Sequence, residues 1–268
     1  MDIYSLDRII TKTKPKSLLR NLKIFLDLLK CMQTYPLRQY FYLRGKAGRT
    51  LSVRIKDLGE KSVKARTGTV DYATLISVFY EKYHLPPREL TRNPTILDLG
   101  CNTGYTLIHF KYLYPDSKII GVEMDKDNFE LARVNTEGLT DCHLLNMAVS
   151  TKDGVVKYDK NSDVDAYHIQ YTNGENEKKL AEIESITIKS IINKFKLECI
   201  EYVKMDIEGE EINIFDNDLS WLNIVKMMNI EVHGSQSDLN KIMIKIKKHN
   251  FQVWKGTKHL LSIMATKN

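Results

Sequence analysis

From residue 94 onward, short apolar runs alternate with segments whose apolar residues recur at helical spacing. Strands that alternate with helices form a mostly parallel sheet with helices covering both faces. The pattern therefore predicts an α/β fold built on a seven-stranded sheet. The predicted strands are TILDL (95–99), KIIGVEM (118–124), CHLLNMAV (142–149), YVKMDI (202–207), VKMMNIEV (225–232), FQVWK (251–255) and HLLSIMAT (259–266). Helices are expected around 107–114, 128–135, 190–195, 211–215 and 238–249.

Two segments depart from this alternation. Only Gly256, Thr257 and Lys258 separate the last two strands, and so short a connection cannot cross over between parallel strands. One of these two strands should therefore run antiparallel to the rest. Residues 151–173 add the strand-like runs GVVKYDK and VDAYHIQ, which we interpret as a β-structured insertion near the functional site.

Residues 1–88 have a different pattern from the alternating part, and we interpret them as an N-terminal extension to a domain formed by 89–268. An amphipathic helix is expected over 17–32, followed by a hairpin of strands 51–55 and 62–66 and a helix over 70–83. The first helix should pack on the body of the protein or on a second copy in a homodimer. Peripheral membrane association is the alternative. The apolar stripe of this helix consists of Leu18, Leu22, Phe25, Leu29 and Met32, with Lys12, Lys14, Lys16 and Arg20 upstream.

The charge is distributed unevenly along the 268 residues, whose formal net charge is +6. Residues 1–66 contain 16 Lys/Arg and 5 Asp/Glu, whereas residues 67–268 contain 24 and 29. A basic N-terminal part favours an anionic partner such as a membrane surface, a lipid- or nucleotide-linked sugar or nucleic acid, unless it is only a solvated surface.

The remaining bulk features favour a cytoplasmic protein. The four cysteines have no disulfide-like spacing, the N-terminus lacks the pattern of a signal peptide, and no apolar stretch is long enough to cross a bilayer.

The segment ILDLGCNTGY, residues 96–105, carries the first chemical signal. An apolar strand ends in a turn with Gly100 and Gly104, and a helix follows at once, so free N–H groups of the helix start face a ligand that glycine allows to approach. The turn lacks the Gly-Lys-Ser/Thr ending of a phosphate-binding loop and two of the three glycines of a dinucleotide site. The carboxylate of Asp98 suits a cationic ligand, such as one with an ammonium or a sulfonium group.

Polar residues also follow the next strands. Glu123 ends the second strand, 25 residues after Asp98, and an acid about 20 residues on can bind ribose hydroxyls in dinucleotide folds. Asn146, Met147 and Ala148 end the third strand, where an adenine base would lie. Each of these positions also has a purely structural interpretation.

The segments YVKMDIEGEE (202–211) and NIEVHG (229–234) place Asp206, Glu208, Glu231 and His233 at the ends of two later strands. Ligands bind at the carboxyl ends of parallel strands. Glu231 and His233 are two residues apart and should point to the same side. Helix capping explains Glu210 or Glu211 well and Asp206 poorly.

TILDLGCNTGYT, Glu123, NMAVS and above all VKMDIEGEE resemble the FkbM family of S-adenosylmethionine-dependent methyltransferases. The resemblance covers residues 94 to about 235 well and 66–83 more loosely, whereas about 45 basic N-terminal residues lie outside it. It implies a class I methyltransferase Rossmann-like fold and methylation of a hydroxyl on a sugar, glycan, polyketide or small secondary metabolite, as in glycan biosynthesis. The residues expected to bind S-adenosylmethionine are Asp98, Gly100, Asn102, Thr103, Gly104, Glu123, Met124, Asn146, Ala148 and Asp206.

Methyl transfer from a sulfonium is an in-line displacement that releases a neutral thioether, so the protein must align the acceptor oxygen and remove its proton. We expect His233 to be the base, with Asp206 or Glu208 orienting it or replacing it. In the alternative, Asp206, Glu208 and Glu231 hold a divalent cation that acidifies the hydroxyl. We favour the metal-free route.

Two other functions compete with this one. A nucleic-acid methyltransferase would fit the basic N-terminus, but Asp-Ile-Glu-Gly replaces the Asn/Asp-Pro-Pro-aromatic turn of base-methylating families, and its acids would repel a polyanion. A binding protein without catalysis would not need Asp206, Glu208 and His233 together. We therefore expect a small-molecule or glycan acceptor and no nucleic acid.

Overall fold

The computed structural model describes residues 16–159, 169–170, 180–258 and 261–267. The chain divides into two compact units, Met1–Tyr83 and His84–Asn268. The boundary expected from the sequence, between residues 88 and 89, lies a few residues beyond this division. Each unit is described by itself.

The N-terminal unit contains the predicted helix and hairpin. Its helices are α2 (Lys16–Thr34), α3 (Leu37–Leu43) and α4 (Asp71–Ile76), and α4 continues into a π-helical turn over Ser77–Glu81. Strands β1 (Thr50–Ile55) and β2 (Lys61–Arg66) pair antiparallel, joined by a 3-10 turn over Lys56–Leu58. The inward faces of these elements form the core of the unit, which includes Cys31, Tyr35, Tyr40, Leu43, Val53 and Ile55. Within the described residues, no helix combines the length and the apolar character needed to cross a bilayer.

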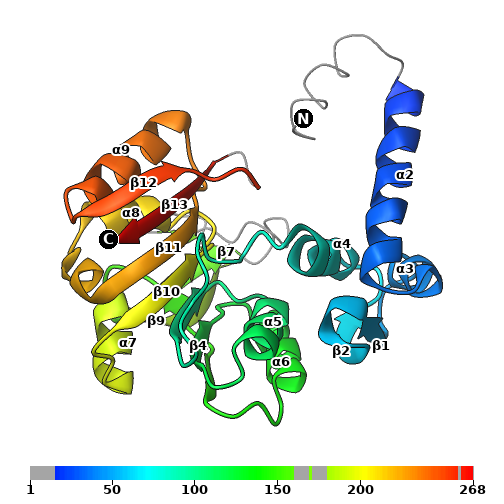
Figure 1. Ribbon diagram of the computed structural model, residues 1–268, viewed down its shortest axis with the longest axis horizontal. Helices are drawn as coiled ribbons and strands as arrows, with labels where there is room; N and C mark the ends of the chain where they lie inside the picture. The colour runs from blue at the N-terminus through cyan, green and yellow to red at the C-terminus, as the bar shows by residue number, and fades with distance from the viewer. Residues whose placement is uncertain (1–15, 160–168, 171–179, 259–260, 268) are drawn as a thin grey trace. The chain divides into compact units, whose positions relative to one another are not determined.

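The second unit is built on the predicted seven-stranded sheet, in the order β12-β13-β11-β10-β3-β4-β5 (Figure 1). These strands are β3 (Thr95–Leu99), β4 (Lys118–Val122), β5 (Cys142–Leu145), β10 (Ile200–Met205), β11 (Val225–Glu231), β12 (Phe251–Lys255) and β13 (Ser262–Lys267). β13 runs antiparallel to both of its neighbours, which confirms the reversal expected from the short final connection. The other neighbouring pairs in this sheet are parallel.

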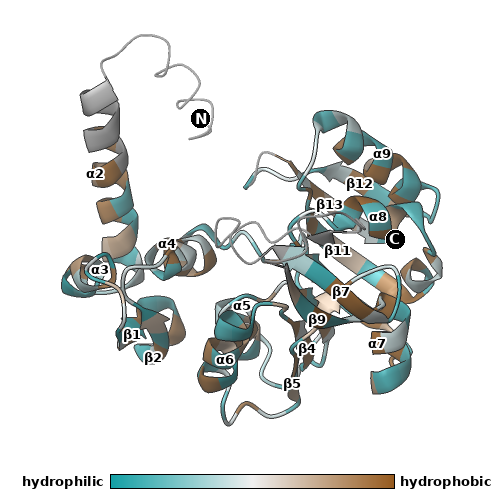
Figure 2. Cartoon of the chain, turned by 180° about the vertical axis from the view of Figure 1, so that it is seen from behind, coloured by the Kyte–Doolittle hydropathy of each residue, from teal (hydrophilic) through white to brown (hydrophobic). Residues whose placement is uncertain are grey.

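Helices cover both faces of the sheet because side chains alternate sides along each strand. One face carries Leu97, Leu99, Val203 and Met205 and packs against α7 (Ile188–Phe195), α8 (Glu211–Asp216) and α9 (Gln236–Lys247). The other face carries Ile96 and Tyr202 and packs against α5 (Tyr105–Leu113). Helix α6 (Lys126–Asn135) follows β4 and contacts α5. In Figure 2, hydrophobic stretches on the strands of the sheet are interrupted by hydrophilic ones.

The predicted strand over 142–149 is wrong as a single element. It splits into β5, in the main sheet, and β6 (Ala148–Val149), in a separate four-stranded sheet of order β6-β9-β7-β8. Asn146 lies at the break, where its side-chain amide donates to the backbone oxygens of Glu123 and Met124. The chain leaves the main sheet at this position.

The predicted β-structured insertion is present in the described residues as β7 (Gly154–Asp159) and β8 (Ile169–Gln170). The remainder of VDAYHIQ lies outside the described residues. Strand β9 (Leu180–Ile186), which pairs with both β6 and β7, was not expected from the sequence.

Candidate functional site

Two glycines shape the turn between β3 and α5. Gly100 has a φ of 80°, and a Cβ there would lie 1.7 Å from the backbone oxygen of Asp206, so no other residue fits without displacing a strand end. Gly104, at the N-terminus of α5, has a φ of 79° and approaches Ala132 of α6. The predicted turn is therefore held between the end of β10 and helix α6.

The turn offers one enclosed polar group that the protein does not satisfy. The hydroxyl oxygen of Thr103 is buried and has no hydrogen-bond partner among the described residues. The neighbouring Asn102 has a φ of 49°, and its side-chain oxygen accepts from the N–H of Thr103 (2.8 Å). A buried polar atom without a partner costs free energy unless a ligand or water satisfies it.

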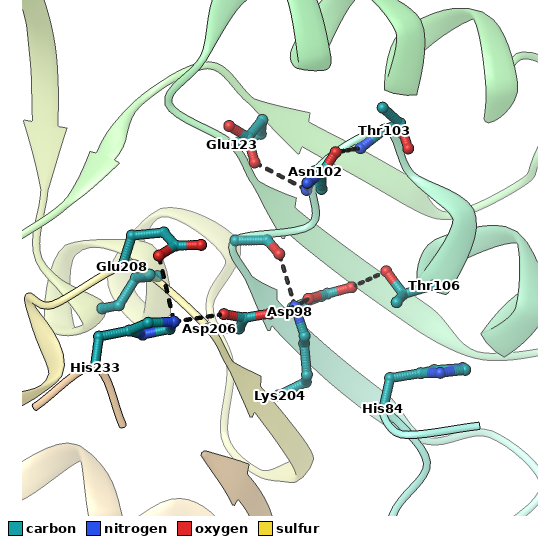
Figure 3. A network of polar contacts seen from close by, with 12 residues as sticks. His84, Asp98, Asn102, Thr103, Thr106, Glu123, Lys204, Asp206, Glu208 and His233 are labelled. Carbon is teal, nitrogen blue, oxygen red and sulfur yellow. Dashed lines mark hydrogen bonds and ion pairs between the residues drawn. The ribbon is translucent and has the colours of Figure 1, made fainter. Parts of the chain in front are cut away.

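Glu123 lies beside this turn, as the prediction of a ligand-binding carboxylate requires (Figure 3). One of its oxygens accepts from the N–H of Asn102 (2.8 Å), and the other accepts from the N–H of Asp125 (2.7 Å). Burial raises the pKa of Glu123 to about 7, against the lowering effect of these two hydrogen bonds. Each carboxylate oxygen has a second lone pair, so both can still accept from a ligand hydroxyl.

Asp98 is fully buried, and its carboxylate is enclosed by protein groups. It accepts from the hydroxyl of Thr106 and lies 3.5 Å from the ammonium of Lys204. Burial raises the pKa of Asp98, although Lys204 and Thr106 act in the opposite direction. An internal cation, the ammonium of Lys204, thus lies beside Asp98, where the sequence suggested a cationic ligand.

Lys204 connects the glycine turn to the end of the neighbouring strand. Its ammonium donates to the backbone oxygen of Gly100 (2.7 Å) and lies 3.3 Å from an oxygen of Asp206. The side chain is only 3% exposed, so these ion pairs are screened little by solvent. Lys204 therefore holds Asp98 and Asp206 on either side of one buried positive charge.

The predicted catalytic residues meet at the ends of β10 and β11. Nε2 of His233 lies 3.8 Å from Oδ1 of Asp206 and 3.3 Å from Oε2 of Glu208. Glu208 occupies a turn at a φ of 55°, followed by Gly209 at 110°. All three side chains are partly exposed, so a ligand can reach them.

Glu211 is the site residue that sequence reasoning assigned to the wrong role. Its side chain does not cap a helix; it is fully buried and accepts from Nδ1 of His233 (3.1 Å). The same carboxylate accepts from the backbone N–H groups of Ile207 and Gly209, both at 3.0 Å. Glu210 does not cap either, because it accepts from the side chains of Ser150 and Asn213. The close spacing of acids in EGEE was the only available signal.

This environment changes the protonation of His233. Burial by itself lowers its pKa, but the hydrogen bond and charge of Glu211, with Glu208 and Asp206, outweigh burial and raise it to about 9. Burial raises the pKa of Glu208 to about 8, although the charge of His233 opposes the shift. Because Glu211 accepts from Nδ1, the neutral imidazole has its lone pair on Nε2, facing Asp206 and Glu208.

A metal ion would find a different donor set from the one expected. Within the described part of the chain, Asp206, Glu208 and His233 are the residues whose donor atoms all lie within 4.8 Å of one another. Glu231 is not a member of this group. Glu231, the last residue of β11, acts on Glu208 through its charge.

Comparison with known proteins gives one family match. A model of the FkbM methyltransferase domain matches residues 98–253. No protein with a curated description matches the sequence.

Several solved structures are similar to the chain at low identity. They include precorrin-6y C5,15-methyltransferase from Geobacter metallireducens, at 12% identity and a TM-score of 0.40, covering 66% of this chain and 81% of that one. The fibrillarin/Nop5p complex has 13% identity and a TM-score of 0.45, covering 78% and 88%. The Methanococcus jannaschii fibrillarin pre-rRNA processing protein has 10% identity and a TM-score of 0.43, covering 81% and 80%. Similarities this weak carry no information about substrate.

Proposed function

The chain belongs to the FkbM methyltransferase family, and we propose that it transfers a methyl group from S-adenosylmethionine to a hydroxyl oxygen of a sugar, glycan or small metabolite. The observation that carries this proposal is the buried Lys204, which bridges the glycine turn and the acidic residues beside His233. One network thus links the residues suited to the methyl donor with those suited to deprotonating an acceptor.

The residues around the glycine turn fit S-adenosylmethionine. The buried, unsatisfied hydroxyl of Thr103 needs a partner, and Glu123 retains lone pairs for ribose hydroxyls beside it. Asn102, Gly100 and Gly104 bring the backbone of the turn close to such a ligand, and Met124 and Asn146 continue the same edge of the sheet. Ala148 lies outside that sheet, in β6, and is almost completely buried. When bound, S-adenosylmethionine supplies an electrophilic methyl group on a sulfonium.

The proton of the acceptor hydroxyl is removed by the cluster at the ends of β10 and β11. Nε2 of neutral His233 takes the proton, and the resulting imidazolium is stabilised by Glu211 on Nδ1. Asp206 is held by Lys204, and its Oδ1 lies 3.8 Å from Nε2, so its charge also stabilises the imidazolium once it forms. The chain thus supplies the base and a place for the positive charge that the base acquires.

A hydroxyl acceptor suits this cluster better than a nucleic acid does. Four carboxylates lie close together here, those of Asp206, Glu208, Glu211 and Glu231, and they would repel a phosphate backbone. A neutral alcohol has no such penalty, and its high pKa makes a positioned base necessary. Sugars, glycans and small hydroxylated metabolites present alcohols of this kind.

Two measurements on the purified chain test this function. Titration calorimetry should detect S-adenosylmethionine and its demethylated product, and no nicotinamide dinucleotide. Isotope-labelled S-adenosylmethionine should then transfer its methyl group to at least one acceptor in a panel of nucleotide-linked sugars, glycans and hydroxylated metabolites. Binding of NAD alone would contradict the cofactor, transfer to RNA or DNA would contradict the acceptor class, and donor binding without any transfer would favour a cofactor-binding protein.

A further inference from the structure

Helix α2 presents an apolar stripe that the N-terminal unit leaves uncovered. Leu22, Phe25, Leu29 and Met32 are 40%, 55%, 41% and 51% exposed, and their spacing places them on one side of the helix. The opposite side is the one that packs, because Cys31 and Thr34 are almost completely buried. The helix therefore has two apolar sides, and only one of them is used by its own unit.

Helix α3 adds aromatic and basic side chains to the exposed surface of the same unit. Phe41 is 60% exposed and Tyr42 is 54% exposed. The guanidinium of Arg38 lies over the ring of Tyr42, 5.4 Å from its centroid, and donates to its hydroxyl. Aromatic rings with cations beside them are typical of side chains that enter the headgroup region of a membrane.

The charge around these two helices is mostly positive, although α2 also carries Asp27, whose charge acts on Tyr40 and Arg44. Residues 28–56 contain seven Lys/Arg and no Asp or Glu. The nearby acids Asp57 and Glu60 form ion pairs with Lys82 and Arg54. In the connection after α3, Lys46 and Arg49 are exposed, and their side chains form no ion pair with any described residue.

We propose that α2 and α3 bind the surface of a membrane containing anionic phospholipids. An occupant of this surface must accept apolar side chains and positive charge together, and an anionic lipid surface does both. A second copy of the chain would cover the stripe but would bring two basic surfaces together. Nucleic acid would match the charge but would leave the aliphatic residues of the stripe in contact with water or phosphate. This proposal does not depend on the proposed enzymatic activity.

Flotation of the full-length protein with lipid vesicles tests the proposal. The protein should float at physiological salt with phosphatidylcholine vesicles that contain phosphatidylserine, and not with phosphatidylcholine alone. The double variant Phe25→Glu/Leu29→Glu should lower the affinity at least about tenfold, because it places two charges on the inserted side. Ile244→Glu is the matched control, since Ile244 is a comparably exposed apolar residue (56%) on α9, and it should bind like the wild type.

A second variant tests the contribution of the basic residues separately from that of the apolar stripe. Lys46→Glu/Arg49→Glu leaves every apolar side chain in place. It should weaken binding to anionic vesicles, and the remaining binding should depend less on salt concentration. Circular dichroism and size-exclusion mass measurements should show that all variants remain folded. The proposal is overturned if the wild type does not float, if both double variants float like the wild type, or if Phe25→Glu/Leu29→Glu only converts a dimer into a monomer.

Discussion

Glu211 sets the chemical state of His233. Its buried carboxylate accepts from Nδ1, so the ring is held in one tautomer and its positive form is stabilised. Since the base must be neutral to accept a proton, raising the pKa of His233 to about 9 makes less of the active form available at neutral pH. The same shift makes the imidazole a stronger base once it is neutral.

The rate of turnover should therefore keep rising with pH well above neutrality, which gives the pH profile a rising limb. The value of kcat/KM should increase about tenfold per pH unit and level off near the pKa of about 9 that His233 has in the free enzyme. His233→Ala should abolish this limb and lower turnover by ~10²–10⁴-fold, while calorimetry shows unchanged affinity for S-adenosylmethionine. Near-normal turnover in His233→Ala would remove the residue from the role of base.

The pH profile of Glu211→Gln tests whether Glu211 acts on His233 or only stabilises the fold. Without the negative charge, burial should prevail and the limb should move to lower pH. Asp216→Asn is the control, because Asp216 is an exposed acid that pairs with Lys245 on the surface, and its profile should match the wild type. An unmoved limb in Glu211→Gln would mean that Glu211 serves only the fold.

Chelation distinguishes the two roles considered for the acidic cluster. The metal-free route predicts that dialysis against EDTA leaves turnover unchanged and that added Mg²⁺ or Mn²⁺ does not raise it. The measurement is the initial rate before and after chelation, with metal content determined in parallel. A rate that falls on chelation and returns with one cation would make Asp206, Glu208 and His233 ligands instead.

Glu123 should contribute to cofactor affinity through its second lone pairs. Glu123→Ala should weaken binding of S-adenosylmethionine by ~1.5–3 kcal/mol, because a charged acceptor of two ribose hydroxyls is lost. Glu123→Gln should lose less, since it keeps one acceptor oxygen. Glu130→Gln, at an exposed position on α6, should bind like the wild type in the same calorimetric titration. Equal affinity in all three variants would place the ribose contact elsewhere.

At the scale of single elements, hydrophobic periodicity predicted most strands and helices correctly. It missed β9, and it treated 142–149 as one strand although this apolar run contributes to two sheets. Periodicity records how apolar a strand is and contains no information about where its hydrogen-bonding partner changes. The break lies at Asn146, whose amide donates to backbone oxygens 22 and 23 residues away in the sequence.

In the glycine turn, the close approach of Gly100 to the backbone of Asp206 can be tested separately from the strain of a positive φ. Gly100 and Gly138 both have positive φ, 80° and 77°, but a Cβ at Gly138 would meet nothing within 4 Å. Gly138→Ala should therefore cost only the conformational penalty, about 1 kcal/mol. Gly100→Ala should cost more and also lower turnover, because its Cβ displaces the backbone of Asp206. Chemical unfolding and initial rates provide the comparison, and equal losses of stability would contradict the close approach.

At the scale of the whole chain, the two units have different functions in our account. The residues that fit the methyl donor and the acceptor all lie in His84–Asn268, whereas the surface proposed to bind lipid lies in Met1–Tyr83. A chain beginning at His84 should therefore retain its affinity for S-adenosylmethionine in calorimetry and lose flotation with anionic vesicles. If cofactor affinity falls although circular dichroism shows a folded protein, the N-terminal unit contributes to the cofactor site.

The sequence by itself determined the order and type of most elements, the antiparallel final strand, the glycine turn and the family. The structural features among these depend on short-range properties: apolar period, connection length and the conformational freedom of glycine. The family was inferred from the resemblance of the motifs TILDLGCNTGYT and VKMDIEGEE. It also identified Asp206, Glu208 and His233 as candidates, because polar residues at the carboxyl ends of parallel strands lie at one edge of a sheet.

Only the tertiary structure decided which charges meet. Lys204 reaches Gly100 and Asp98, more than 100 residues earlier in the chain, and the positive φ of Glu208 turns the chain so that Glu211 reaches His233. Such contacts depend on how separate strand ends and turns are placed in space, and spacing along the chain does not contain that information. The same limit applies to α2, whose amphipathic pattern does not reveal which of its apolar sides packs inward and which remains exposed.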